Sequence, residues 1–235
     1  DAEYNWLVMR AAGGFGLTMT CAATAQKEGI GFSGQLGIYD DKHLEGLKRF
    51  AAGLNAHGTH SVVQLHHAGM RTPPALSGRP AQCPSDDAET GAKAMTLDEV
   101  KRSIDAFIAA ARRAEQAGFH GVELHGAHGY LICEFLSPEI NRRTDEYGGS
   151  LANRLRYPLE VFRALRPVVE RDPDTVLICD GGEFAQWGQG LLNAPRRLIN
   201  GVAGSIGSSL PYAGGACFVE KKAPVFAVLG DGTFG

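Results

Sequence analysis

Residues 117–131 read AGFHGVELHGAHGYL, and this stretch carries the strongest signal for the fold. Ala117 and Gly118 end a helical pattern, and a short run typical of a strand (GVEL, 121–124) follows. A loop that contains two glycines comes after this strand. Helix, turn and buried strand in this order are typical of one repeat of an α/β protein with parallel strands. Chemistry in such folds collects at the carboxyl ends of the strands, so the loop after residue 124 is the first candidate site.

The same alternation extends in both directions along the chain. Helices are predicted at His43–His57, Thr96–Ala117 and Leu151–Val169, and strands at Gly16–Thr20, Ser61–Leu65, Gly121–Leu124 and Thr175–Ile178. A capping box marks the start of one helix, because Thr96 is followed three residues later by Glu99. Between the strand and helix patterns, Met70–Ala94 is rich in Pro, Ser and Gly, which predicts a long loop. Loops of this length in compact domains usually have a function. The alternation predicts an α/β fold with a parallel sheet, open or closed into a barrel.

Composition and charge exclude several classes of protein. The chain has 235 residues, 44% of them hydrophobic, with a formal net charge of −3, which suits one large or two small globular domains. Nothing in this balance predicts nucleic acid as a partner, and no apolar run approaches the about 20 residues of a membrane span. The first residues lack a leader pattern, and five scattered cysteines without metal-binding spacing predict a reduced, cytoplasmic protein.

Three hydrogen-bonding side chains, those of His125, His128 and Tyr130, lie within six residues after the GVEL strand. Two neutral imidazoles can donate to a carbonyl oxygen and stabilise the charge that develops there, and a tyrosine hydroxyl can deliver a proton. A metal site is the rival interpretation, although it lacks a carboxylate as third ligand. Histidines that serve only the loop structure are the other rival. Three such groups at one strand end favour a catalytic site.

Four segments together resemble the old yellow enzyme family of FMN-dependent oxidoreductases, which are TIM barrels. They are QLHHAGMR (64–71), the MTLDEV helix start (95–100), AGFHGVELHGAHGYL (117–131) and EFLSPEINRRTDEYGGSLANR (134–154). The resemblance spans residues 11–170. A complete barrel of this type needs roughly 250 residues, so the resemblance implies a fold of partial TIM-barrel-like βα repeats. The family's first strand is expected to precede residue 1.

The resemblance also implies roles for particular residues. His125 and His128 would bind the carbonyl oxygen of the substrate, or a phenol, and Tyr130 would be the proton donor. Gln64 would contact the pyrimidine edge of FMN, and Ala22 would lie against the flavin. The implied reaction is the ping-pong reduction of activated alkenes of the enoate or enone type. NAD(P)H reduces FMN, the flavin gives hydride to the β-carbon, and the tyrosine protonates the α-carbon.

Charged residues in the last of these segments allow two interpretations. Arg142, Arg143, Asp145 and Tyr147 either contact the substrate or form Arg–Asp pairs that fix the loop, and the second interpretation is favoured. The QLHHAGMR segment also carries Met70 as an extra residue relative to the family's usual Gly-Arg.

The C-terminal segments resemble a different family. ICDGGEFAQWG (178–188), INGVAGSIGSSLPYA (199–213) and VLGDGTFG (228–235) are similar to the start of the diphosphate-binding domain of thiamine-diphosphate enzymes. Glycines let backbone N–H groups approach a diphosphate. The chain has 31 glycines, well above the roughly 7% of an average protein, and much of this excess lies after residue 180. The resemblance implies thiamine diphosphate and Mg²⁺, with Asp231 as the metal ligand. The alternative function is therefore a thiamine-diphosphate- and Mg-dependent carbon–carbon lyase, and a chimeric α/β scaffold without activity is a third.

Two segments follow from these resemblances: a flavin-oxidoreductase-like partial barrel over 1–172 and a glycine-rich, thiamine-diphosphate-binding-like α/β segment over 173–235. The strand at 175–178 falls where the next barrel strand is due. Three explanations for the presence of two unrelated families in one chain remain open. The chain is a chimera of fragments that complete one another, or it consists of parts of a longer chain, or its residue identities were assigned imperfectly. The expected partner is a small-molecule substrate, with no nucleic acid and no membrane, and a homo-oligomer is left open.

Overall fold

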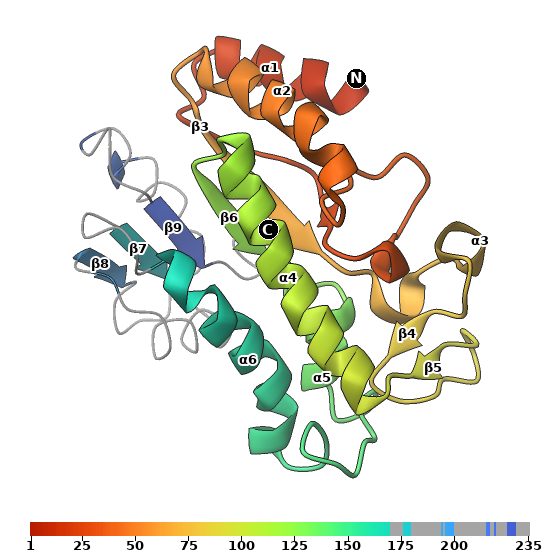
Figure 1. Cartoon of the computed structure of the whole chain (residues 1–235). Helices are drawn as coiled ribbons and strands as arrows, with labels where there is room; N and C mark the ends of the chain where they lie inside the picture. Colours follow the sequence, from red (N-terminus) through yellow and green to blue (C-terminus); the bar gives the residue numbers. More distant parts are fainter. Residues whose placement is uncertain are drawn as a thin grey trace.

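A computed structural model describes residues 1–169, 176–179, 194, 196–199, 215–216, 219 and 225–228 of the chain. Within these residues helices alternate with parallel strands, as Figure 1 shows, which confirms the α/β fold. None of the helices in this described part is both long and apolar enough to cross a membrane.

The central sheet is parallel and is built on β3 (His60–His66). One edge of β3 pairs first with β1 (Leu17–Met19) and then with β2 (Ala23–Thr24), so these two short strands act as one interrupted strand. The other edge pairs with β6 (Gly121–Leu124), with Leu65 opposite Leu124. The carboxyl ends of β3 and β6 are therefore level, and the loops that follow them leave the sheet at the same edge.

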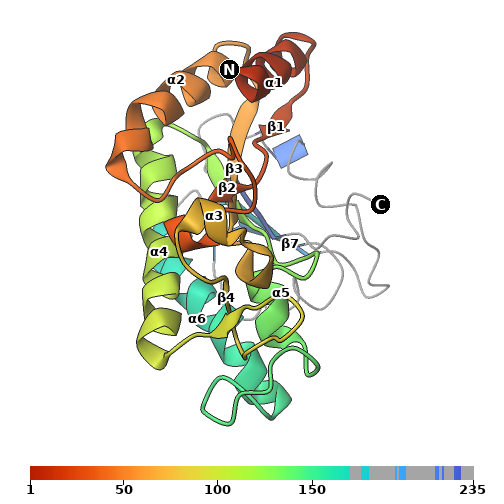
Figure 2. The same ribbon diagram turned by 90° about the vertical axis from the view of Figure 1, so that its right-hand side faces the viewer.

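The principal helices are α1 (Ala2–Ala12), α2 (Leu44–Asn55), α4 (Leu97–Ala117) and α6 (Leu151–Val169). Of these, α2 and α4 lie along one side of the central strands, as Figure 2 shows. The helix α4 packs against both α2 and α6 and begins at the expected capping box of Thr96 and Glu99. Its end is set by Gly118, whose φ of 89° is left-handed, a conformation that glycine adopts without strain.

The segment predicted as a loop, Met70–Ala94, contains short regular elements, so that prediction was incomplete. A turn of 3-10 helix, η3 (Gly69–Arg71), and the short α3 (Pro74–Ser77) precede a parallel pair formed by β4 (Gln82–Cys83) and β5 (Lys93–Ala94). Strands of two residues are too short to show alternation in the sequence, which is why the pattern missed them. Helices α1 and α5 (Leu131–Leu136) were also not anticipated.

A second parallel sheet is formed by β7 (Val176–Cys179), β8 (Arg196–Ile199) and β9 (Val225–Val228), in the order β8-β7-β9. The chain order predicts that the strand near 175–178 lies next to β6, but β9 takes that position (Figure 1). Gly121 permits this approach, because a Cβ on it would lie only 3.2 Å from the carbonyl oxygen of Val225. The next barrel position is thus filled by a strand from the far end of the chain.

Candidate active site

Four aromatic rings gather where β3 and β6 end, and we call His66, His125, His128 and Tyr130 the four-ring cluster. Ring centroids lie 4.4 Å apart for His66 and Tyr130, 5.2 Å for His125 and Tyr130, and 5.1 Å for the histidines at 125 and 128. A hydrogen bond of 3.3 Å joins Nδ1 of His128 to Nε2 of His125. The structure therefore brings together the three residues predicted as catalytic and adds His66 to them.

The backbone after β6 turns sharply to place these side chains. His128 has a φ of 57° and Gly129 a φ of 66°, so two successive residues are left-handed. Histidine is one of the residues other than glycine that adopts this conformation more often than most, although with some strain. The turn leaves His128 exposed, His125 buried and Tyr130 half-buried at the start of α5. The turn thus brings imidazole and phenol groups together, and side chains of this kind can form hydrogen bonds to one small ligand.

Gln64 lies on the same face of β3 as His66, because side chains two residues apart on a strand point the same way. Its partner in the sheet register is Glu123 of β6, which is only 6% exposed. Burial raises the pKa of Glu123 to about 7, and a hydrogen bond from Gln64 opposes this rise. Within the described residues the second carboxyl oxygen of Glu123 has no hydrogen-bond partner. The amide predicted to contact FMN therefore has a buried carboxyl group beside it.

Ala22, the other predicted flavin contact, is connected to the cluster by Gln35. The side-chain Nε2 of Gln35 donates to the carbonyl oxygen of Ala22 at 2.8 Å and lies 3.0 Å from Nδ1 of His66. Its Oε1 accepts from the backbone N–H of Gly31 at 2.7 Å. One glutamine thus joins the start of β2 to the carboxyl end of β3.

A buried carboxyl group also lies under the loop that follows β3. Glu134 of α5 is fully buried, and its Oε1 accepts a hydrogen bond from the backbone N–H of Met70 at 2.8 Å. Burial raises the pKa of Glu134 to about 8, against the opposing effects of this hydrogen bond and of Arg71. The guanidinium carbon of Arg71 lies 5.6 Å from the centre of the Tyr130 ring. Met70, the extra residue of the segment, is therefore part of the link between the two loops.

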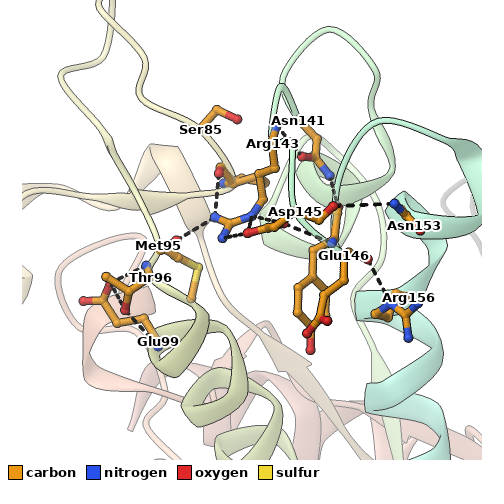
Figure 3. Close-up of polar contacts among 12 residues, drawn as sticks. Ser85, Met95, Thr96, Glu99, Asn141, Arg143, Asp145, Glu146, Asn153 and Arg156 are labelled. Atoms are coloured by element: carbon orange, nitrogen blue, oxygen red, sulfur yellow. Dashed lines mark hydrogen bonds and ion pairs between the residues drawn. The ribbon is translucent and has the colours of Figure 1, made fainter.

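Arg143 holds a separate network that confirms the structural interpretation of the Arg–Asp pair (Figure 3). Its Nε and Nη2 both bond the carboxylate of Asp145, at 3.0 Å and 2.5 Å. Its Nη1 donates to the backbone carbonyls of Pro84 and Met95. The side chain is 8% exposed, so it is occupied in fixing loops and is not available to a substrate.

Asp231, the predicted Mg²⁺ ligand, lies outside the described residues. Across the part of the chain that is described, no group of three or more His, Cys, Asp or Glu side chains could hold a metal ion. Sequence reasoning missed Gln35, Glu123 and Glu134 as members of the site. Glu123 could have been found, because it lies on the strand that ends just before His125 and is two residues from it in the sequence.

The fold and the site together define a partial α/β barrel with hydrogen-bonding side chains at the carboxyl ends of its strands. Residues 1–179 match the model of the NADH:flavin oxidoreductase / NADH oxidase family, and the chain belongs to this family. Residues 180–235 match the model of the C-terminal TPP-binding domain of thiamine pyrophosphate enzymes. Both resemblances read from the sequence are thus confirmed. The division into 1–172 and 173–235 stays a prediction.

Three curated relatives illustrate the family. The chain is 42% identical over 165 residues to a probable NADH-dependent flavin oxidoreductase, YqiG, of Bacillus subtilis, covering 68% of this chain and 44% of that protein. It is 39% identical to an NADPH dehydrogenase of Bacillus cytotoxicus, covering 76% of this chain and 55% of that protein. It is 36% identical to an NADH oxidase of Thermoanaerobacter brockii, covering 80% of this chain and 30% of that protein. The chain therefore spans about half the length of these relatives, or less. Their names and that of the family identify FMN and NAD(P)H as the family's cofactors.

Solved structures support the same fold. A 2-naphthoyl-CoA reductase in complex with 2-naphthoyl-CoA superimposes with a TM-score of 0.73 at 28% identity, covering 96% of this chain and 40% of that one. Histamine dehydrogenase from Rhizobium sp. 4-9 gives a TM-score of 0.66 at 29% identity, with 77% and 28% covered. Morphinone reductase gives 0.67 at 20% identity, with 97% and 76% covered, and shows the likeness of fold alone.

Proposed function

We propose that this chain carries the flavin- and substrate-binding part of an FMN-dependent oxidoreductase that reduces activated alkenes with NAD(P)H. The observation that supports this most is the convergence of His125, His128 and Tyr130 at one strand end, next to the strand that carries Gln64. Family membership supports flavin and NAD(P)H chemistry, and the alkene substrate rests on the site residues.

The residues at the carboxyl end of β3 fit a flavin. The pyrimidine edge of FMN alternates an N–H donor with carbonyl acceptors, and the primary amide of Gln64 offers both a donor and an acceptor. Beside it, one buried carboxyl oxygen of Glu123 has no hydrogen-bond partner among the described residues and would offer a further polar group at this edge. Ala22 offers a small side chain where a flat ring has to approach closely. Gln64 and Ala22 would therefore hold the cofactor.

The chain's own side chains would do the rest of the chemistry. FMN, when bound, supplies the transfer of hydride from NAD(P)H to the alkene. His125 and His128 donate hydrogen bonds to the carbonyl oxygen of the substrate and stabilise the negative charge that develops on it. Tyr130 gives its hydroxyl proton to the α-carbon. The neighbouring rings hold the substrate in one orientation.

The test separates the two halves of the reaction. FMN is first titrated into the apoprotein and followed by its absorbance and fluorescence, and reduction by NADH or NADPH is then measured without oxygen. Reoxidation by 2-cyclohexen-1-one follows in a second mixing step. Tyr130→Phe should slow reoxidation about 100-fold or more and leave flavin reduction unchanged, because only the second step needs the proton. Tyr39→Phe, whose ring contacts His43 and none of the four-ring cluster, is the matched control. Equal losses in both halves would refute the role of Tyr130.

A second candidate function rests on the match of residues 180–235 to a TPP-binding domain. We propose that Asp231 would ligate Mg²⁺ for thiamine diphosphate if this segment is functional in the chain. Isothermal titration with thiamine diphosphate, with and without Mg²⁺, tests this. Mg²⁺-dependent binding that Asp231→Asn abolishes would support a lyase function, and FMN binding without it would support the flavoenzyme alone.

A further inference from the structure

Two backbone groups fix the orientation of the Gln35 side-chain amide. Its Nε2 lies 2.8 Å from the carbonyl oxygen of Ala22, a group that only accepts. Its Oε1 lies 2.7 Å from the backbone N–H of Gly31, a group that only donates. Exchanging the two ends of the amide would break both bonds, so Nε2 is the donor and Oε1 the acceptor.

The second hydrogen of this Nε2 points to His66. The distance from Nε2 of Gln35 to Nδ1 of His66 is 3.0 Å. A donor on Gln35 requires a lone pair on His66 Nδ1, and a neutral imidazole of this kind carries its proton on Nε2. Burial, helped by the neighbouring His125 and His67, lowers the pKa of His66 to about 3, which agrees with a neutral ring.

The proton on Nε2 of His66 has no acceptor within the described part of the chain. The residue is 2% exposed, and its ring packs edge-to-face against Tyr130, with centroids 4.4 Å apart, and lies 5.6 Å from the ring of His125. Buried N–H groups without a partner are rare and destabilising, so each calls for an explanation. This one lies among the groups that bind the substrate in the proposed function.

We propose that Gln35 locks His66 as the Nε2–H tautomer and that this N–H is a further hydrogen-bond donor of the site, for an acceptor oxygen of the substrate. The proposal rests on the proposed function and deepens it. With His125 and His128, the site would offer three donors to carbonyl or phenolate oxygens. A ligand that presents an N–H or O–H donor at this point would be discriminated against, because two donors would face each other.

The tautomer can be measured directly by NMR on the chain without FMN. Long-range ¹H–¹⁵N spectra of ¹⁵N-histidine-labelled protein distinguish protonated from unprotonated ring nitrogens, and His66→Asn identifies the signals by their loss. We expect His66 to show a proton on Nε2 and none on Nδ1 between pH 5.5 and 8. A charged ring, or a proton on Nδ1, at pH 7 would overturn the proposal.

Ligand binding tests the donor itself. Binding of 4-fluorophenol to the FMN-loaded protein is followed by ¹⁹F NMR in wild type, His66→Phe and Gln35→Glu. The glutamate can only accept, so a neutral His66 in this variant carries its proton on Nδ1 and has a lone pair on Nε2, and the same ¹⁵N spectra check that the ring stays neutral. We expect both variants to bind 4-fluorophenol about fivefold more weakly, as for the loss of one hydrogen bond. Gln116→Glu, an exposed change on α4, should bind like wild type, and thermal unfolding checks that all variants fold.

The outcomes separate the two proposals. Unchanged 4-fluorophenol affinity in His66→Phe and Gln35→Glu, together with a loss in His125→Ala, would overturn the role of His66 and leave the proposed function standing. Failure of the wild-type chain to bind FMN and 4-fluorophenol would overturn the proposed function, and the ligand role of His66 with it. Weaker binding in both variants, with the expected tautomer in wild type, supports the inference.

Discussion

The carboxyl group of Glu134 accepts a hydrogen bond from the backbone N–H of Met70 at 2.8 Å, across 64 residues of sequence. This bond ties the loop after β3 to the helix that follows the four-ring cluster. A Cβ on Gly69, the residue before Met70, would overlap the same carboxyl group. Glu134 therefore couples the two loops that carry the candidate active site, and it does so while fully buried.

Glu134→Gln should make the stability of the protein less dependent on pH. The folded state raises the pKa of Glu134 from 4.5 to about 8, so between these values it binds more protons than the unfolded chain. Its contribution to stability is therefore complete below pH 4.5 and is lost as the pH rises toward 8. Urea unfolding measured at pH 5.5 and at pH 8.5 gives the fall in the free energy of unfolding between these two pH values. We expect this fall to be smaller in Glu134→Gln than in wild type by about 1 kcal/mol or more.

Glu139→Gln is the matched control, because Glu139 is exposed near the end of the same segment. It should retain the full pH dependence of wild type. An identical pH dependence in Glu134→Gln and wild type would show that the buried carboxyl group does not titrate in this range.

Gly69→Ala should destabilise the protein more than Gly78→Ala. Both glycines have positive φ angles, 59° and 78°, so alanine is strained at either position. Only at Gly69 does the new methyl group meet the carboxyl group of Glu134, because the space around a Cβ on Gly78 is open. We expect a loss of about 1 kcal/mol for Gly78→Ala and about 3 kcal/mol for Gly69→Ala in urea unfolding. Equal losses would mean that the loop moves away from Glu134 at little cost.

Substitutions of His128 should separate its backbone conformation from its hydrogen bonding. Its φ of 57° is left-handed, and asparagine tolerates this region whereas β-branched residues do not. His128→Val should lower the free energy of unfolding by about 1–2 kcal/mol and weaken phenol binding. His128→Asn should stay within about 0.5 kcal/mol of wild type and keep a donor for the ligand. A stable valine variant would indicate that the turn relaxes without strain.

Arg143→Lys should destabilise the protein although the charge is kept. The guanidinium bonds both oxygens of Asp145 and two backbone carbonyls, and a single ammonium group cannot reach all of these acceptors. We expect a loss of about 2–4 kcal/mol in thermal or urea unfolding. Arg102→Lys, at an exposed position of α4, should change stability by less than about 0.5 kcal/mol. Similar small losses in both variants would contradict the structural role of Arg143.

Elements with a strong local pattern could be predicted, and weaker ones could not. Helix α6 has the predicted bounds, Leu151–Val169, because an amphipathic pattern of this length has few alternatives. The short strands β4 and β5 were missed, since two residues form a strand only when a partner lies alongside. Chain order suggests the strand near 175–178 as the next strand after β6, whereas β9 contacts β6 in the structure, and no local signal encodes that contact.

The candidate site shows the same division. His125, His128 and Tyr130 lie within six residues, so their clustering follows from one turn of the chain. Gln35 lies in an irregular segment 31 residues from His66, and nothing in its local sequence distinguishes it from an ordinary surface glutamine. Glu134 is the first residue of the segment 134–154 that resembles the family, yet its hydrogen-bond partner Met70 lies in another loop, so the sequence did not indicate their contact.

The sequence by itself determined the α/β alternation, the family and the group of side chains after GVEL, because these depend on residues close together in the chain. The tertiary structure alone decided the contact between Gln35 and His66, the burial of Glu134 and the position of β9 beside β6. The physical reason is that hydrogen-bond polarity and desolvation depend on which groups meet in space. These contacts are set by the packing of segments that are distant in the sequence, and local periodicity does not encode them.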